Sequence, residues 1–266
     1  MRTPSQPRLT SDWFFVLPSL LLVALLGLPV AALLWRGGLG GMLQFAGEPS
    51  AIAALRLSLW TSTVSVILTL LTGTPLAFVL ARGEFRGKAW IELLIDLPIV
   101  LPPSVAGIAL LIAFGREGMF GEALSAAGIT LPFTTAAVIM AQTFVSAPLF
   151  VRAARVGFAA VDSQLREAAY VEGSNEWQLF HGIMFPLARR AIVSGAVLAW
   201  TRALGEFGAT ILFAGNMPGI TQTMPLAIYL GLERGLGIAL ALSFILVVVS
   251  VLLLLLMRWL DRNPHS

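Results

Sequence analysis

Long apolar segments alternate with short polar ones along most of this 266-residue chain. A helix needs roughly 20 apolar residues to cross a bilayer, and six segments come close to that length. A seventh apolar stretch, 225–233, is too short to cross and is predicted to lie at the outer surface. The pattern predicts an all-α, polytopic membrane protein with one six-helix domain at 13–260. Its spans are predicted at about 13–35, 55–80, 91–114, 131–151, 191–214 and 238–260.

Both ends of the chain are polar. Residues 1–12 and 261–266 are predicted to be tails on the same side of the membrane, because six is an even number of crossings. A basic start before an apolar segment is also compatible with a cleaved signal peptide. The segment 13–35 is longer than the apolar region of such a peptide and has aromatic residues at both ends, which favours a retained span.

The third predicted span contains Pro98, Pro102 and Pro103. Proline removes a backbone donor and kinks a helix, and a membrane tolerates this only where neighbours or water satisfy the freed carbonyls. We therefore predict that this span faces the interior of the bundle. The second span, 55–80, is rich in Ser and Thr and is predicted to pack against other helices rather than lipid.

The fifth predicted span carries two charged residues, Arg202 and Glu206. Spacing by four puts them on one helix face, close enough to pair. Ionisable groups inside a membrane usually face a bundle interior or an aqueous path. Gly205 and Gly208 keep this helix slim enough for close packing. The hypothesis is a helix that lines a transport path or gate, and the alternative is an ion pair with a purely structural role.

The longest polar interval, 152–190, lies between the fourth and fifth predicted spans. Asp162 is predicted to cap a short helix there, and Gly173 to end it by allowing a turn that other residues resist. The helix is predicted to carry one compact apolar face, and its two alanines would let another protein approach closely. That face consists of Leu165, Ala168 and Ala169.

A second short helix is predicted directly after this turn. Ser174 or Asn175 is suited to cap it, and Pro186 is expected to interrupt it. Taken alone, the interval is also compatible with an ordinary helical hairpin between two spans.

Charge and composition support a membrane protein and orient it. The chain is 58% hydrophobic and 12% charged, with a mean hydropathy of +0.88. Of its 17 Lys and Arg residues, 12 flank the side that holds both termini and 4 flank the opposite side, with Arg202 inside a span. Because positive residues mark the cytoplasmic side, we predict that the termini and the interval 152–190 are cytoplasmic.

Several kinds of chemistry find no support in the sequence. There is no cysteine, and His181 and His265 are too few and too far apart for a metal site. No G-x-x-x-x-G-K-[ST] motif is present to bind ATP phosphates, so the chain is not predicted to be an ATPase. The basic residues flank spans, so we predict the lipid bilayer as surroundings and no nucleic-acid partner. No cofactor is predicted.

The polar interval resembles the EAA loop of the permeases of binding-protein-dependent ABC importers. The matching residues are Glu167, Ala168, Ala169, Gly173, Ile183 and Pro186. Phe185 stands where that family usually has Leu, which keeps the apolar character. The resemblance implies a type I importer fold in which this loop docks on a cytoplasmic ATPase subunit and transmits its closure to the membrane. The matching residues would then carry the coupling.

Two further stretches, 97–121 and 201–229, resemble the molybdate importer permeases, with sulfate permeases as nearest relatives. The latter tend to have Tyr where Phe207 stands. The resemblance implies an assembly in the bacterial plasma (inner) membrane of two copies of this chain, two cytoplasmic ATPase subunits and an external oxyanion-binding protein. The residues proposed for the translocation pathway or gate are Pro102, Pro103, Arg202, Gly205, Glu206 and Gly208.

Some alternatives remain open at this point. Sulfate or tungstate is an alternative substrate. A membrane-embedded enzyme or a channel is an alternative of another class. An enzyme needs polar groups that converge within the spans, and only Arg202 and Glu206 qualify, whereas a channel needs no docking site for an ATPase.

Overall fold

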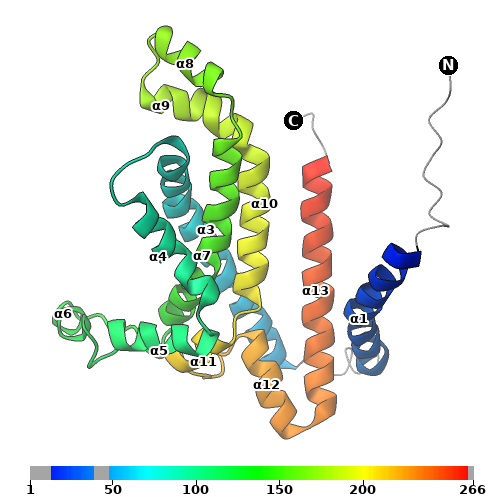
Figure 1. Cartoon of the computed structure of the whole chain (residues 1–266). Coiled ribbons are helices and arrows are strands. Elements are labelled where there is room, and N and C mark those ends of the chain that lie inside the picture. Colours follow the sequence, from blue (N-terminus) through cyan, green and yellow to red (C-terminus); the bar gives the residue numbers. More distant parts are fainter. Residues whose placement is uncertain (1–12, 39–47, 263–266) are drawn as a thin grey trace, which may run out of the picture.

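The computed structural model describes residues 13–38 and 48–262, and over these residues its secondary structure is helical (Figure 1). The predicted tail 1–12 and the end of the other tail, 263–266, lie outside the described residues. The elements are α1 (Trp13–Gly37), α3 (Pro49–Arg82), α4 (Lys88–Val100), α5 (Pro103–Phe114), α6 (Gly121–Ala126), α7 (Thr135–Ala159), α8 (Ser163–Val171), α9 (Glu176–Leu179), the π-helix η2 (Phe180–Met184), α10 (Phe185–Leu204), α11 (Gly208–Phe213), α12 (Met224–Arg234) and α13 (Leu236–Arg262).

Four helices within the described residues have the length and apolar character of a membrane span. They are α1, α3, α7 and a continuous helix, Glu176–Leu204, which comprises α9, η2 and α10. The bent pair α4–α5 makes a fifth if it counts as one span. The sixth predicted span corresponds to α13, a helix of 27 residues whose apolar part is described over Leu236–Leu252. The count of six stays a prediction.

The third span is not the single kinked helix that the sequence predicted. It consists of α4 and α5, which meet at an angle of 120°. Leu101 and Pro102, at the break, both have extended backbone, with ψ of 132° and 137°. The residue before a proline is driven out of the helical region, and two consecutive prolines extend this effect over two residues. In Figure 1, α5 accordingly lies across the bundle axis that α7 follows.

The fifth span also differs from its predicted form. The predicted helix 191–214 is broken after Leu204, and α11 starts only at Gly208. Conversely, the helix extends further on its other side, back through Phe185 to Glu176. The short apolar stretch 225–233, predicted to be too short to cross, corresponds to the helix α12.

The core of the bundle is formed by α3, α7 and α10. Most Ser and Thr residues of the predicted span 55–80 are buried, which confirms that this helix packs against protein; they are Ser58, Thr61, Ser62, Ser65, Thr69 and Thr74. The hydroxyl of Thr143 on α7 donates to that of Ser65 over 3.0 Å. Further along α3, a β-carbon at Gly73 would lie only 2.9 Å from the ring of Phe150 on α7. The two helices therefore run alongside each other at close range.

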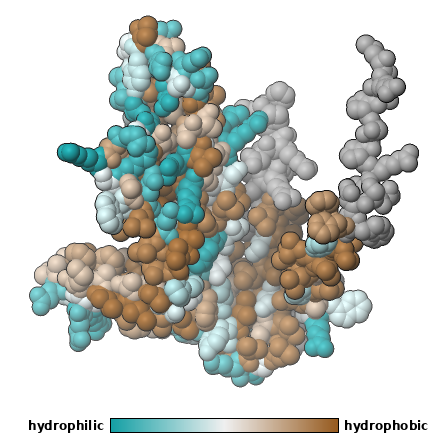
Figure 2. Space-filling view, viewed as in Figure 1, coloured by the Kyte–Doolittle hydropathy of each residue, from teal (hydrophilic) through white to brown (hydrophobic). Residues whose placement is uncertain are grey.

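Polar and apolar side chains separate along the molecule. In Figure 2, the hydrophilic colour gathers over the end that carries α8 and α9, and hydrophobic side chains dominate the middle of the bundle and α1. None of the most apolar 18-residue window of α1 is buried. An apolar helix whose side chains are exposed along most of its length is what a lipid environment accommodates.

Candidate functional site

The polar interval folds as a pair of short helices, and its first helix has the predicted ends. The Asp162 side chain accepts a hydrogen bond from the Gln164 amide over 2.9 Å and caps α8. Gly173 follows α8 with φ of +83°, in the left-handed region that favours glycine. Both predictions are confirmed. Residues 152–190, for which the resemblance implies coupling to an ATPase, are called the coupling loop below.

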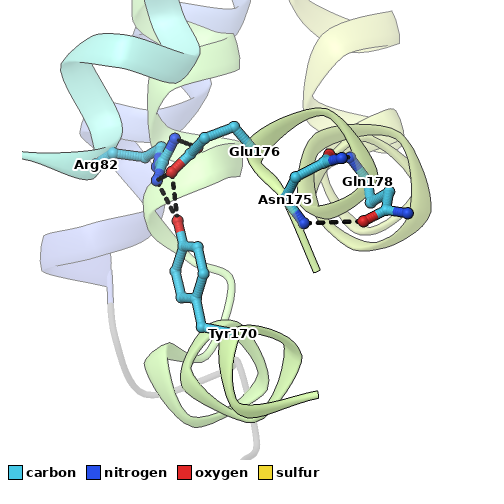
Figure 3. A network of polar contacts seen from close by, with 5 residues as sticks. All are labelled: Arg82, Tyr170, Asn175, Glu176 and Gln178. Atoms are coloured by element: carbon cyan, nitrogen blue, oxygen red, sulfur yellow. Dashed lines mark hydrogen bonds and ion pairs between the residues drawn. The ribbon is translucent and has the colours of Figure 1, made fainter. Parts of the chain in front are cut away.

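The second helix is capped by Asn175, one of the two predicted candidates. Its side chain accepts from the Gln178 amide over 2.9 Å, and the Gln178 side chain accepts from the Asn175 amide over 2.8 Å (Figure 3). The prediction that Pro186 interrupts this helix is wrong, because the helix continues to Leu204. The Phe185 amide donates to the Phe180 carbonyl in a wide π turn. This turn changes the hydrogen-bond register just before the proline, which has no N–H to donate.

The predicted apolar face of α8 is divided between the core and solvent. Ala169 is buried, whereas Ala168 and Leu165 are exposed. Further apolar side chains are exposed at the same end of the molecule, including Val171 at 89% and Trp177 at 69%. Exposed apolar side chains at a polar end of a protein indicate a surface for another protein. Of the other motif residues, Glu167, Gly173 and Pro186 are exposed and Ile183 packs against the core.

A polar network ties the coupling loop to the end of α3 (Figure 3). The Arg82 guanidinium pairs with both carboxylate oxygens of Glu176, with Nη2 lying 2.6 Å from Oε1. It also donates to the Tyr170 hydroxyl, which donates in turn to Glu176 Oε1 over 2.8 Å. The same guanidinium lies 4.9 Å from the centre of the Phe78 ring.

A second group of predicted residues lies at the break between α10 and α11. Arg202 Nη1 and Glu206 Oε2 are 2.6 Å apart, so the predicted ion pair is present. Glu206 is only 1% exposed, and its other oxygen accepts from the Ala209 amide over 2.7 Å. Glu206 therefore joins the two helices across the break: it binds a side chain of α10 and caps the start of α11. Sequence reasoning placed it inside one helix and did not predict this cap.

The two helix breaks lie against each other. A β-carbon at Gly208 would be 2.6 Å from the β-carbon of Pro103, and one at Gly107 would be 2.9 Å from the Ala209 carbonyl. The structure thus brings together residues that the sequence assigned separately to the third and fifth spans. Pro102 is the residue that caps α5 at this point. Gly205, with its neighbour Glu206, lies at the other break.

Gly208 and Gly205 give a matched test of this contact. We expect Gly208→Val to lower the thermal unfolding temperature of the purified protein, because overpacking typically destabilises by about 1–3 kcal/mol. Gly205→Ala is expected to have little effect, because its β-carbon would meet only the Thr201 carbonyl, at 3.6 Å. Melting curves in detergent compare the two. Equal unfolding temperatures for both variants would contradict the close contact.

Two acidic residues of α4 were missed by the sequence analysis. Asp96 Oδ1 lies 2.6 Å from Arg152 Nε, and Glu92 Oε1 lies 2.9 Å from Arg155 Nη1. The sequence contained a signal for these two ion pairs, because two acidic residues spaced by four can face two arginines spaced by three. These pairs hold α4, which has no buried residue of its own, to α7. Among the described residues, no group of three or more His, Asp or Glu side chains is placed to hold a metal ion.

Comparison with known proteins gives consistent matches. A family model described as "Binding-protein-dependent transport system inner membrane component" matches residues 73–265. The probable transport system permease protein NifC of Clostridium pasteurianum is 40% identical over 228 residues, 85% of this chain and 79% of its own. The molybdenum transport system permease protein ModB of Mycobacterium bovis is 42% identical over 218 residues, 82% of each chain. A probable sulfate transport system permease protein, cysT of Chlorokybus atmophyticus, is 37% identical over 229 residues, 85% of this chain and 80% of its own.

A solved structure has the same fold at low sequence identity. It is a chain of a bacterial alginate ABC transporter in complex with an alginate pentasaccharide-bound periplasmic protein. The TM-score is 0.77 at 18% identity, and the match covers 96% of each chain.

Proposed function

This chain belongs to the family of binding-protein-dependent transport system inner membrane components and is the permease subunit of an ABC importer, and we propose that molybdate is the oxyanion it carries. The observation that supports molybdate as the substrate is the 42% identity to a molybdenum transport permease over 82% of both chains. Sulfate is the second candidate, favoured by the 37% identity to a probable sulfate permease. Permeases of this family are the membrane component, and this chain carries no motif for binding ATP phosphates.

The proposed assembly contains two copies of this chain, two cytoplasmic ATPase subunits and an external oxyanion-binding protein. A periplasmic protein is bound in the structurally similar alginate transporter, which supports the last of these partners. The exposed apolar side chains of Leu165, Val171 and Trp177 support an ATPase dock on the coupling loop. A channel or a membrane-embedded enzyme would have no use for such a dock.

The proposed mechanism connects the two parts of the site. ATP binding draws the ATPase subunits together and moves the docked coupling loops with them. Because α9 continues into α10, the movement reaches the break at Gly205 and the Arg202–Glu206 pair. The path then opens outward, the binding protein releases its oxyanion into it, and hydrolysis resets the assembly. Arg202 attracts the anion in transit, and Glu206 keeps it from binding too tightly to leave.

The proposed location is a bacterial plasma (inner) membrane, with both termini and the coupling loop in the cytoplasm. Single cysteines test this orientation, because the chain has none of its own. We expect Cys at Ser125 or Pro218, both exposed, to react with an impermeant thiol reagent added to intact cells. Cys at Glu84 or Ser174 is expected to react only after the cells are opened. Labelling of Ser174→Cys from outside would overturn the six-span topology. Gly40, in a predicted outer loop, lies outside the described residues.

Uptake of labelled anions tests the substrate. The permease is expressed with its ATPase and binding protein in a strain that lacks its own molybdate and sulfate permeases. We expect ATP-dependent accumulation of molybdate that excess sulfate does not suppress. Accumulation of sulfate without molybdate would establish the second candidate. Uptake that persists when the ATPase subunit is inactivated by mutation would contradict an importer and favour a channel.

A further inference from the structure

We propose that Arg82 is a positioning residue that makes the coupling loop and α3 move as one body. This inference deepens the proposed function and rests on it, since it concerns how movement of the coupling loop reaches the spans. It starts from the place of Arg82 in the chain: it is the last residue of α3, and its side chain reaches across to both helices of the coupling loop (Figure 3).

The contacts of Arg82 form a closed triangle. Its guanidinium binds the Glu176 carboxylate through two nitrogens, at the first residue of α9. It also binds the Tyr170 hydroxyl, near the end of α8, and Tyr170 and Glu176 are bonded to each other over 2.8 Å. A planar guanidinium has several donors in fixed directions, so it orients both partners at once. One side chain of α3 therefore fixes α8 and α9 on either side of the Gly173 turn.

The helices α8 and α9 have few other attachments to the spans through polar side chains. Within the described parts of the chain, the side-chain hydrogen bonds that join either of them to a third helix are those of Arg82. α8 buries a single residue, Ala169. α9 is continuous with α10, so α10 follows it directly, but α3 has no such continuity. Arg82 supplies a polar link from α3 to both α8 and α9.

The position of α3 makes this link matter. α3 packs closely on α7 at Gly73 and through the Thr143–Ser65 hydrogen bond. A shift of the coupling loop that pulls on Arg82 thus acts on the centre of the bundle as well as on α10. Next to these contacts, the Phe78 ring lies against both the Arg82 guanidinium and the Phe180 ring, and the centres of the two rings are 4.8 Å apart. The end of α3 and the start of η2 therefore already touch, and the polar contacts of Arg82 fix their relative orientation.

A purely structural role makes a different prediction. Partly exposed ion pairs add little to folding stability, and Arg82 and Glu176 are 26% and 60% exposed. If the contacts of Arg82 with Tyr170 and Glu176 only held the loop in shape, their loss would reduce the amount of assembled complex. Uptake and ATP hydrolysis would then fall together. If these contacts transmit movement, hydrolysis continues while uptake is lost.

The experiment uses the complete complex of permease, ATPase and binding protein in proteoliposomes. We expect Arg82→Ala to keep ATP hydrolysis but to lower the oxyanion transported per ATP by about fivefold or more, the lower end of typical coupling between sites. Arg82→Lys keeps the charge but cannot bind Tyr170 and Glu176 with a planar guanidinium. It should therefore recover part of the oxyanion transported per ATP. The matched control is Lys88→Ala, which removes a nearby exposed pair with Glu84 at 3.4 Å and should leave the ratio unchanged. An unchanged ratio in Arg82→Ala would overturn the proposal.

A second readout does not depend on the anion. Spin labels at Gln164→Cys on α8 and Leu71→Cys on α3, both exposed positions, report the distance between the two elements when labelled copies are diluted with unlabelled ones. With Arg82 present, we expect the same distance with and without bound ATP. In Arg82→Ala, the distance should change by several ångströms on ATP binding. A distance that behaves alike in both proteins overturns the proposal, whereas a wrong substrate assignment leaves this readout intact.

Discussion

Gly173→Val is expected to abolish oxyanion uptake while the permease still inserts into the membrane. Gly173 has φ of +83°, where a non-glycine residue is strained by about 1–2 kcal/mol and a β-branched residue by more. Apart from its chain neighbours, no atom of the described residues lies within 4 Å of the position that a β-carbon would take, so the effect comes from the backbone and not from crowding. The turn between α8 and α9 must then change, and the ATPase dock changes with it. Uptake and ATPase co-purification are measured together.

Gly173→Asn is the matched control, because asparagine tolerates the left-handed region better than other side chains do. We expect this variant to keep a large part of the uptake. If Gly173→Val transports as well as the native protein, the turn does not need its glycine, and the coupling loop is reduced to a plain connector. If both variants fail equally, side-chain bulk and not backbone strain is the cause.

Replacing Arg202 and Glu206 together by glutamine is expected to give an assembled permease that transports poorly. Removing one member of a buried ion pair typically costs about 3–5 kcal/mol, because the other charge is left unpaired. Arg202→Ala and Glu206→Gln are therefore each expected to transport poorly, but instability would contribute to both results. The neutral pair removes both charges, and a glutamine at 206 still has an oxygen to accept from the Ala209 amide. If this variant assembles, its failure would then reflect the loss of the two charges.

The structure shows why the double glutamine variant is a better test than an exchange of the two residues. Arg202→Glu with Glu206→Arg restores a pair, but arginine cannot accept the Ala209 hydrogen bond, so its failure would have a structural explanation. Arg234→Gln, at the exposed end of α12, is the control for loss of a positive charge and should transport normally. If the neutral pair transports like the native protein, the ion pair is structural and the pathway assignment is wrong.

Local signals in the sequence were sufficient for both ends of α8 and, to within one residue, for the start of α9, but not for the end of the second helix. Asp162, Gly173 and Asn175 each act through their own backbone or through residues two or three positions away, so the sequence contains both partners. The spacing of Arg202 and Glu206 likewise predicted their pairing correctly. Hydropathy alone located the apolar helices, since it depends on composition over a window.

Tertiary contacts decided what the sequence did not predict. The break after Leu204 lies where α11 packs against α5, and these two helices are far apart in the sequence, although the bond from the Ala209 amide to Glu206 is local. The 120° bend at Leu101 precedes two consecutive prolines, and the bent helix α5 lies against α11, where Pro103 approaches Gly208. Arg82 binds Tyr170 and Glu176, which follow it in the sequence by 88 and 94 positions. Hydrophobic periodicity carries no information about contacts at such separations.

In the proposed mechanism, α10 acts as a lever arm. Its 20 residues span about 30 Å at 1.5 Å per residue. With such an arm, a tilt of about 10° at the end near the coupling loop displaces the far end by about 5 Å, close to one helical turn. A permease built this way needs only a small rotation at its cytoplasmic surface, and the stroke at the Gly205 break is set by the length of the rod.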